Sequence, residues 1–253
     1  MYIDTHAHLT DSAFDGDRQQ LIEGLPERGI GKVIEISCDP KGFEASAELA
    51  EKNHGIYLAF GIHPEFAESY TESDIAALEK YLRHPKCVAL GEIGLDYYWK
   101  PYHREKQIEL FRRQLDMAIE RDMPVSLHVR DAYGDCMEAL ESYNGRLRGV
   151  MHCFSGSAEI AERCAALGLY IAFGGALTFK NNKKGPAACA ATPMDRLLTE
   201  TDCPYMAPEP HRGERNDPGS IPAICRKMAE IKGVSEGEME RAAEENAERL
   251  FGL

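Results

Sequence analysis

The sequence predicts an α/β protein with a (β/α)8 architecture, the TIM barrel, formed by a single domain over residues 1–253. Short apolar runs alternate with amphipathic helical stretches eight times along the chain, which indicates an all-parallel sheet. Several runs are continuously apolar, as in strands that are covered on both faces. No linker, repeat or low-complexity tract marks a second domain. A closed barrel is the simplest arrangement, and a doubly wound open sheet is the alternative.

The elements follow one another in a regular order. The strands are expected near residues 2–6, 32–38, 56–61, 88–93, 124–129, 148–153, 169–174 and 197–201. The clearest helix covers 101–122, where apolar residues recur at helical spacing. Ser157 is expected to cap a helix that runs toward Gly168. Residues 204–222 hold five prolines and form the one long irregular segment, and a final helix over 236–251 is expected on the barrel exterior.

Composition limits the class of protein. Its hydrophobic content of 43% and charged content of 28% are those of a soluble globular chain. No basic leader or apolar run of membrane length is present, and the eight cysteines form no CxxC pair. We therefore expect a cytoplasmic monomer that binds no membrane. The net charge of −13 weighs against a nucleic-acid substrate unless basic residues gather locally.

Six residues of the types that bind divalent metals lie at the ends of the predicted strands: His6, His8, Glu92, His128, His152 and Asp202. His6 and His8 are two residues apart, so on a strand both imidazoles share one face. The carboxyl ends of parallel strands meet at one face of a barrel, where active sites of this fold lie. An open sheet would not bring ligands from five such strands to one point. Residues at strand starts, such as Lys32, Arg148 and Arg196, should then be structural.

The ligand types point to two metal ions. Imidazole and carboxylate without thiolate suit zinc, manganese, cobalt or nickel, and magnesium less readily. Six ligands exceed the roughly three of a catalytic zinc, so two ions that share a carboxylate fit better. We assign His6, His8, Glu92 and Asp202 to one ion, and Glu92, His128 and His152 to the other. Asp202 is also expected to orient the attacking water.

Several motifs together resemble the TatD-type metal-dependent deoxyribonucleases. They are Asp4-Thr5-His6-Ala7-His8-Leu9, Gly61-Ile62-His63-Pro64, Gly91-Glu92-Ile93-Gly94-Leu95-Asp96-Tyr97, His152-Cys153-Phe154-Ser155-Gly156, Glu200-Thr201-Asp202-Cys203-Pro204-Tyr205 and Asn246 with Arg249-Leu250-Phe251. The match runs in order from residue 2 to residue 251. The resemblance implies a TIM barrel, a divalent-metal site and hydrolysis of DNA phosphodiesters, often from the 3' end. It also implies that the six residues are the metal ligands and that His63 is an additional active-site histidine.

Further residues are expected at the same face. His63 follows the third strand and could give a proton or a hydrogen bond to a phosphate oxygen. Phosphate-binding cations are expected at Arg130, Lys183, Lys184 and Arg212, which we call the basic rim. Four further cations are expected at the same face of the barrel: Arg104, Lys106, Lys180 and Arg215. For Arg130, a salt bridge with Asp131 or another acid is the alternative. Tyr97, Tyr98, Trp99 and Tyr102 could stack bases, although packing is the alternative for Tyr97.

Three functions are compatible with these residues. The leading hypothesis is a binuclear phosphodiesterase (a 3'-5' exonuclease or DNase) that acts on DNA single strands or ends. The alternative enzyme is an amidohydrolase-type C–N or ester hydrolase, whose substrate would be a cyclic amide, a deaminase substrate or an aminoacyl-tRNA ester. Many barrels of that type bridge their metals with a modified lysine, but Glu92 occupies the end of the fourth strand. A non-catalytic metal-binding or scaffold protein is the third, disfavoured because all six ligand types are intact.

Overall fold

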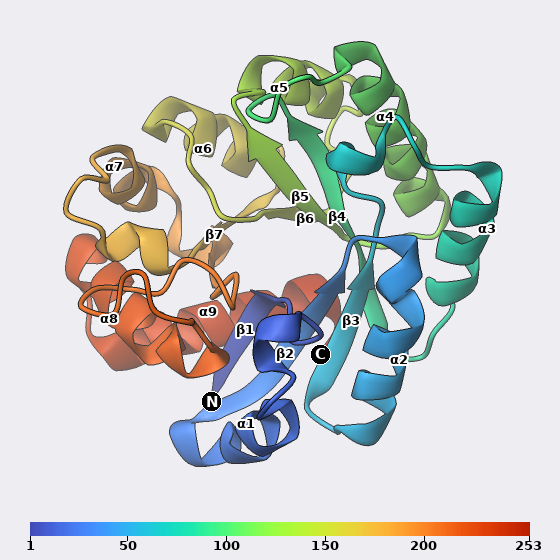
Figure 1. Cartoon of the computed structure of the whole chain (residues 1–253). Helices are drawn as coiled ribbons and strands as arrows, with labels where there is room; N and C mark the ends of the chain where they lie inside the picture. Colours follow the sequence, from blue (N-terminus) through green and yellow to red (C-terminus); the bar gives the residue numbers. More distant parts are fainter.

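The chain forms a barrel of eight parallel strands surrounded by helices (Figure 1). The computed structural model describes residues 1–253. The strands are β1 (Tyr2–Ala7), β2 (Ile30–Ser37), β3 (Ile56–Phe60), β4 (Cys87–Asp96), β5 (Val125–Arg130), β6 (Gly149–Met151), β7 (Tyr170–Phe173) and β8 (Leu197–Thr199). Their order in the sheet follows the chain from β1 to β8. The predicted fold class and the eight predicted strands are confirmed.

Side chains and loop residues join β1 to β8 where a regular ladder is absent. The Thr5 hydroxyl donates to the Thr199 carbonyl at 2.9 Å, and the Asp202 amide donates to the His6 carbonyl at 2.9 Å. A parallel bridge also links Ala7 with Cys203. The open-sheet alternative is therefore wrong, and the barrel closes next to His6 and His8.

Nine α-helices surround the strands or lie at one end of the barrel. They are α1 (Arg18–Gly24), α2 (Phe43–Lys52), α3 (Glu72–Tyr81), α4 (Arg104–Glu120), α5 (Tyr133–Ser142), α6 (Ala158–Ala166), α7 (Lys184–Ala191), α8 (Ile221–Lys232) and α9 (Glu236–Phe251). The short 3-10 helices are η1 (Ser12–Phe14), η2 (Pro26–Arg28), η3 (Pro40–Gly42), η4 (Pro64–Phe66), η5 (Gly175–Thr178), η6 (Met194–Arg196) and η7 (Pro218–Ser220). The Ser157 side chain accepts a hydrogen bond from the Ile160 amide, as expected of an N-cap.

The position of α9 differs from the expectation that it packs on the barrel exterior. A cluster of buried residues from seven strands includes Ala247, Leu250 and Phe251 of α9. This is the arrangement of a barrel interior, and in Figure 1 the helix lies behind the strands. The helix therefore closes one end of the barrel. The sequence did not distinguish a helix that covers the end of the barrel from one that packs on its side.

Charged residues at the strand starts have structural partners. The Lys32 ammonium lies 2.8 Å from Glu248, and Arg148 lies 3.1 Å from Asp122. The Arg196 guanidinium lies over the Tyr170 ring, 5.2 Å from its centroid. The structural role predicted for these three cations agrees with the contacts.

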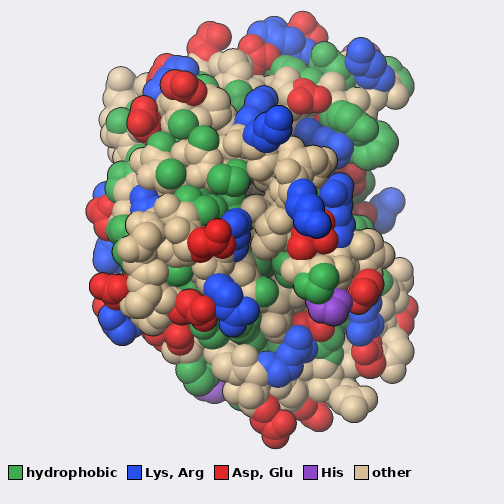
Figure 2. All heavy atoms as spheres, turned by 90° about the vertical axis from the view of Figure 1, so that its left-hand side faces the viewer, with side chains coloured by type: hydrophobic (Ala, Val, Ile, Leu, Met, Phe, Trp, Pro, Cys, Tyr) green, Lys and Arg blue, Asp and Glu red, His purple; other side chains and the backbone are tan.

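The side of the molecule formed by α6, α7 and α8 mixes acidic and basic side chains with scattered apolar ones (Figure 2). No extended surface of one sign is visible on this side. None of the helices is both long and apolar enough to span a bilayer.

Candidate metal centre

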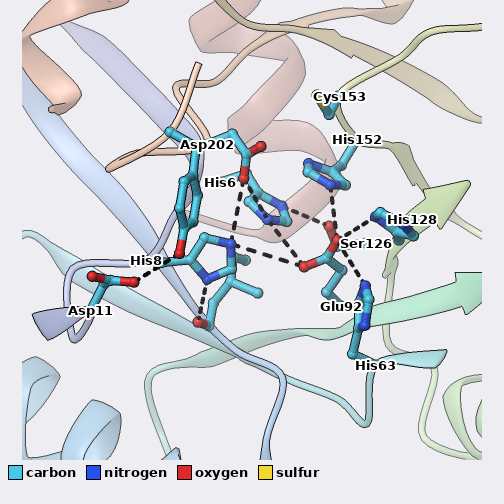
Figure 3. Close-up of polar contacts among 12 residues, drawn as sticks. His6, His8, Asp11, His63, Glu92, Ser126, His128, His152, Cys153 and Asp202 are labelled. Carbon is cyan, nitrogen blue, oxygen red and sulfur yellow. Dashed lines mark hydrogen bonds and ion pairs between the residues drawn. The ribbon is translucent and has the colours of Figure 1, made fainter. Parts of the chain in front are cut away.

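Glu92 lies at the centre of the six predicted ligands (Figure 3). Its Oε2 is 3.6 Å from His6 Nε2 and 4.0 Å from His8 Nε2. Its Oε1 is 2.8 Å from His128 Nδ1 and 3.0 Å from His152 Nε2. The two oxygens of one carboxylate therefore face two different groups of histidines.

Asp202 completes the group around Oε2. Its Oδ1 is 3.5 Å from His8 Nε2 and 3.9 Å from His6 Nε2. The His6 ring also stacks on His152 with 3.6 Å between centroids, which places the two groups side by side. The structure thus brings all six residues together in the two predicted sets, and their role as metal ligands stays a prediction.

A β-bulge places Glu92 in the barrel mouth. Gly91 pairs with Ser126 and Ile93 pairs with Leu127, so Glu92 is an extra residue opposite β5. An unpaired bulge residue is a common device for aiming a side chain near an active site. Glu92 is therefore inside β4, which continues to Asp96, whereas the sequence placed it near the strand end. His128 likewise lies within β5.

Close approach of two strands next to the site requires glycine at position 94. The residue has φ +152, and a Cβ there would overlap the backbone carbonyl oxygen of His128. At the last strand, Asp202 has φ 57 and Cys153 after β6 has φ 44. Left-handed conformations cost about 1–3 kcal/mol at non-glycine residues and cluster at functional sites.

For three of the four histidines His6, His8, His128 and His152, the ring nitrogen that faces away from Glu92 has a hydrogen-bond partner. These pairs are His6 Nδ1 with Ser126 Oγ at 3.3 Å, His8 Nδ1 with the Ile36 carbonyl at 3.2 Å, and His128 Nε2 with Asp96 Oδ2 at 3.0 Å. Such contacts fix the orientation of metal-binding histidines and raise their basicity. Sequence reasoning did not single out Asp96 or Ser126. Asp96 lies within the motif of Glu92, but its contact with His128 depends on strand pairing.

Glu200 is a second functional candidate that sequence reasoning missed. It is fully buried, and its Oε2 lies 3.5 Å from His152 Nδ1. Its other oxygen accepts a hydrogen bond from the Cys153 amide. The only signal in the sequence was its place two residues before Asp202. Both histidines that face Glu92 Oε1 therefore have a carboxylate next to their other ring nitrogen: Asp96 for His128 and Glu200 for His152.

One unpartnered buried atom supports a metal at this site. His6 Nε2 is buried without a hydrogen-bond partner, which is costly for a polar atom. His6 Nε2 points at the carboxylates of Glu92 and Asp202. Metal–nitrogen bonds of about 2.0–2.1 Å place tetrahedral ligand atoms about 3.3 Å apart, and the distances around Glu92 fall near that value.

The electrostatics also suit bound cations. Burial alone would raise the pKa of Glu92, but His152, His128 and His6 hold this pKa well below its usual value. Against burial, Asp202 and Glu92 raise the pKa of His8 to about 9. Asp96 and Glu92 similarly raise the pKa of His128 to about 8. Protons on these imidazoles compensate the carboxylates, and metal binding would release them.

His63 approaches the same carboxylate from β3. Its Nε2 lies 3.9 Å from Glu92 Oε1, close enough for a ligand set with Glu92 and His128. Its Nδ1, however, accepts a hydrogen bond from the Glu65 amide at 3.3 Å. Burial lowers the pKa of His63 to about 3, so the ring is neutral. The neutral ring then carries its proton on Nε2, which can donate but cannot bind metal.

Arg130 lies at the mouth of the site with two aromatic neighbours. Its guanidinium is 3.6 Å from the Tyr98 ring centroid and 5.4 Å from that of Trp99. It forms no ion pair with Asp131 or with another acid, so that alternative is wrong. Tyr98 and Trp99 are 49% and 64% exposed, so part of each ring is accessible to a ligand. Arg130 also lines a cavity of about 380 Å³ with His128.

Other predicted cations divide into free and paired ones. Arg104 pairs with Asp135 at 2.6 Å, and Arg215 pairs with Asp17 at 2.6 Å. A neighbouring carboxylate engages each guanidinium, and the phosphate-binding role of Arg104 and Arg215 stays a prediction. Tyr97 donates to the same Asp135 at 2.6 Å, in agreement with the packing alternative.

The rest of the basic rim lies beside another cavity. Lys183 and Lys184 line it, and the Arg212 guanidinium lies 4.3 Å from the Phe179 ring centroid. None of the three has a carboxylate partner. On the opposite side of the centre, a cavity of about 540 Å³ is lined by His8, His63 and Glu92, among others. The candidate centre is therefore open to ligands from two sides.

The fold and the histidine–carboxylate centre are those of metal-dependent barrel hydrolases. A family described as TatD related DNase matches residues 3–252, and the chain belongs to this family. A Bacillus subtilis protein named uncharacterized metal-dependent hydrolase YabD is 39% identical over 100% of both chains. A 3'-5' ssDNA/RNA exonuclease TatD of Erwinia billingiae is 32% identical, with 99% of this chain and 98% of that one covered.

A solved structure agrees with this assignment. The crystal structure of YjjV, a TatD homologue of Escherichia coli, superposes with a TM-score of 0.94 at 32% identity and covers 100% of this chain and 98% of the other. The family resemblance read from the motifs is confirmed, and so is the class of metal-dependent hydrolase.

Proposed function

We propose that the protein hydrolyses phosphodiester bonds of DNA, removing nucleotides from the 3' end of single strands with the help of two divalent metal ions. The observation that carries this proposal is the position of Glu92, whose two oxygens face separate sets of histidines. Such a carboxylate is suited to bridge two ions, and two-metal sites are common in nucleases and phosphatases.

The proposed ligand sets follow the two oxygens. His6, His8, Asp202 and Glu92 would hold one ion, and Glu92, His128 and His152 the other. When bound, two such ions, whether zinc, manganese or magnesium, polarise a phosphoryl oxygen and lower the pKa of water. Asp96 would keep the His128 ring oriented, and Glu200 would do the same for the His152 ring.

Two residues would handle protons and developing charge. Asp202 has a second carboxylate oxygen free to accept a proton from the attacking water. His63 carries its proton on Nε2 and lies near the other side of Glu92. It would donate a hydrogen bond to a phosphoryl oxygen as negative charge develops there.

The nucleic-acid substrate is supported by two further observations. The name of the Erwinia relative includes exonuclease activity on single-stranded DNA and RNA. The basic rim supplies cations without carboxylate partners on an otherwise acidic chain, and exposed Tyr98 and Trp99 offer faces for base stacking. All eight cysteines are free, which is compatible with a cytoplasmic enzyme. A monomeric state stays a prediction.

A substrate panel tests the proposal. Metal-loaded protein is assayed on single-stranded and double-stranded DNA, on RNA, on bis(p-nitrophenyl) phosphate and on N-acyl and ester substrates. We expect hydrolysis of DNA and of the small phosphodiester, with single strands cut fastest from the 3' end. Turnover of N-acyl or carboxylic ester substrates with intact DNA would instead establish the amidohydrolase alternative.

A further inference from the structure

A cavity of about 450 Å³ adjoins the candidate metal centre on the side of β6, β7 and α7. Cys153, Ser155 and Met206 line both this cavity and the one that contains His128 and Asp202. The two spaces are therefore neighbours with common walls. A chain whose phosphate lies at Glu92 would place an adjacent group at the entrance of the second cavity.

The walls of this cavity are largely aromatic and apolar. Phe154 and Phe173 meet edge to face with 6.1 Å between centroids, and Leu177 and Phe179 continue the surface. Phe154, Phe173 and Leu177 are buried, whereas Phe179 is half-buried. Such walls suit a flat ring better than a sugar or a charged group.

The rim of the cavity is cationic. Residues 175–185 contain three lysines and no acidic residue, in a chain of net charge −13. Lys183 and Lys184 line the cavity without carboxylate partners. Arg212 covers the Phe179 ring at 4.3 Å and donates to Asn181 Oδ1 at 3.3 Å. A flat-ring cavity with positive charge at its rim is complementary to a nucleobase that is linked to phosphates.

We propose that this cavity binds one unpaired nucleobase of the substrate strand, next to the phosphate that is cut, with the base stacked on Phe179. The following phosphate would then lie at Lys183 and Lys184. This inference rests on the proposed function. It adds that recognition includes a base, which must leave any duplex before it can enter. A small aryl phosphodiester would lack the second phosphate and gain little from the rim.

Two single variants test the cavity from opposite directions. Phe179→Ala removes the proposed stacking ring, and Ala176→Phe places a bulky side chain on the cavity wall, where Ala176 is half-buried. Phe179→Leu is the matched control, because it keeps an apolar side chain but loses the aromatic face. Circular dichroism and metal content check that each variant is folded and loaded.

The readout is discrimination between a short single-stranded thymidine oligonucleotide and the same oligonucleotide without its terminal bases. For the wild type we expect the abasic substrate to have a KM about 5–150-fold higher, the range of one stacked base. Phe179→Ala, Phe179→Leu and Ala176→Phe should bring this ratio close to one. A ratio that stays at the wild-type value in Phe179→Ala and Ala176→Phe, or full discrimination by Phe179→Leu, would overturn the proposal.

Failure of the proposed function would be visible separately. If the wild type leaves all DNA intact, the nuclease assignment is wrong, and fluorescence anisotropy with the two labelled oligonucleotides replaces the kinetic assay. Tighter binding of the normal strand that is lost in Phe179→Ala would support the base pocket. Equal binding of both strands would refute it.

Discussion

Replacing His63 by alanine tests the role of the histidine beside Glu92 that is not one of the six predicted metal ligands. The amide of Glu65 donates to Nδ1 at 3.3 Å, so the proton of the neutral ring is on Nε2, 3.9 Å from Glu92 Oε1. Loss of one preorganised donor to developing charge lowers kcat by about 10²–10³-fold, or about 2.7–4 kcal/mol. We expect this loss for His63→Ala, with the metal content of the wild type. His63→Gln keeps an N–H donor and should recover part of the activity.

The assay compares single-turnover rates on a DNA oligonucleotide and on bis(p-nitrophenyl) phosphate, with elemental analysis of each protein. A hydrogen bond to a phosphoryl oxygen should help both substrates by a similar factor. Protonation of the leaving oxygen would matter far less for p-nitrophenolate, which leaves without help. A spared p-nitrophenyl substrate would therefore refute the role as a neutral donor. Loss of one metal ion in His63→Ala would show instead that His63 is a ligand.

Three other perturbations follow from the contacts. Asp96→Asn removes the carboxylate that contacts His128 Nε2, and it should weaken metal affinity about 10–100-fold in a calorimetric titration. Unchanged affinity would show that Asp96 does not support the site. Charge reversal of Lys183 and Lys184 should raise the KM for DNA and flatten the salt dependence of that KM, with little effect on a small phosphodiester. An equal effect on both substrates would argue against phosphate binding at the basic rim. Asn246→Ala leaves the buried carbonyl of Leu197 and the partly buried carbonyl of Met194 without their donor, and it should lower the free energy of unfolding by about 2–3 kcal/mol in urea. A loss below about 0.5 kcal/mol, the scale of surface substitutions, would contradict this.

The fold was largely predictable because its signals are local. Each strand is a short apolar run, and each helix has a periodic apolar stripe, so element order alone indicated the barrel. The end of β4 was less predictable. The sequence placed it near residue 93, but pairing with β5 continues to Asp96, and a bulge at Glu92 aims the side chain inward. Bulges and helix placement depend on contacts between distant segments, which also explains the wrong prediction for α9.

The candidate site was predictable in its residues and less so in their surroundings. His6, His8 and Asp202 lie at or just after the ends of strands and have no other evident role, so residue type and position were enough. Glu200 was missed because a buried acid in a motif has no visible partner until β6 brings His152 beside it. The same limit applies to Arg104, which looked free along the sequence but lies against an acid from another helix.

The most direct test of the binuclear centre is a metal titration of chelator-treated protein by isothermal calorimetry, with wild type and Glu92→Gln in parallel. Glu92 contacts both histidine sets through different oxygens. We predict two divalent ions per wild-type chain, and in Glu92→Gln the loss of at least one of them together with DNA hydrolysis. A single ion in the wild type, or two ions bound with unchanged affinity in Glu92→Gln, would contradict the assignment of Glu92 as the bridge.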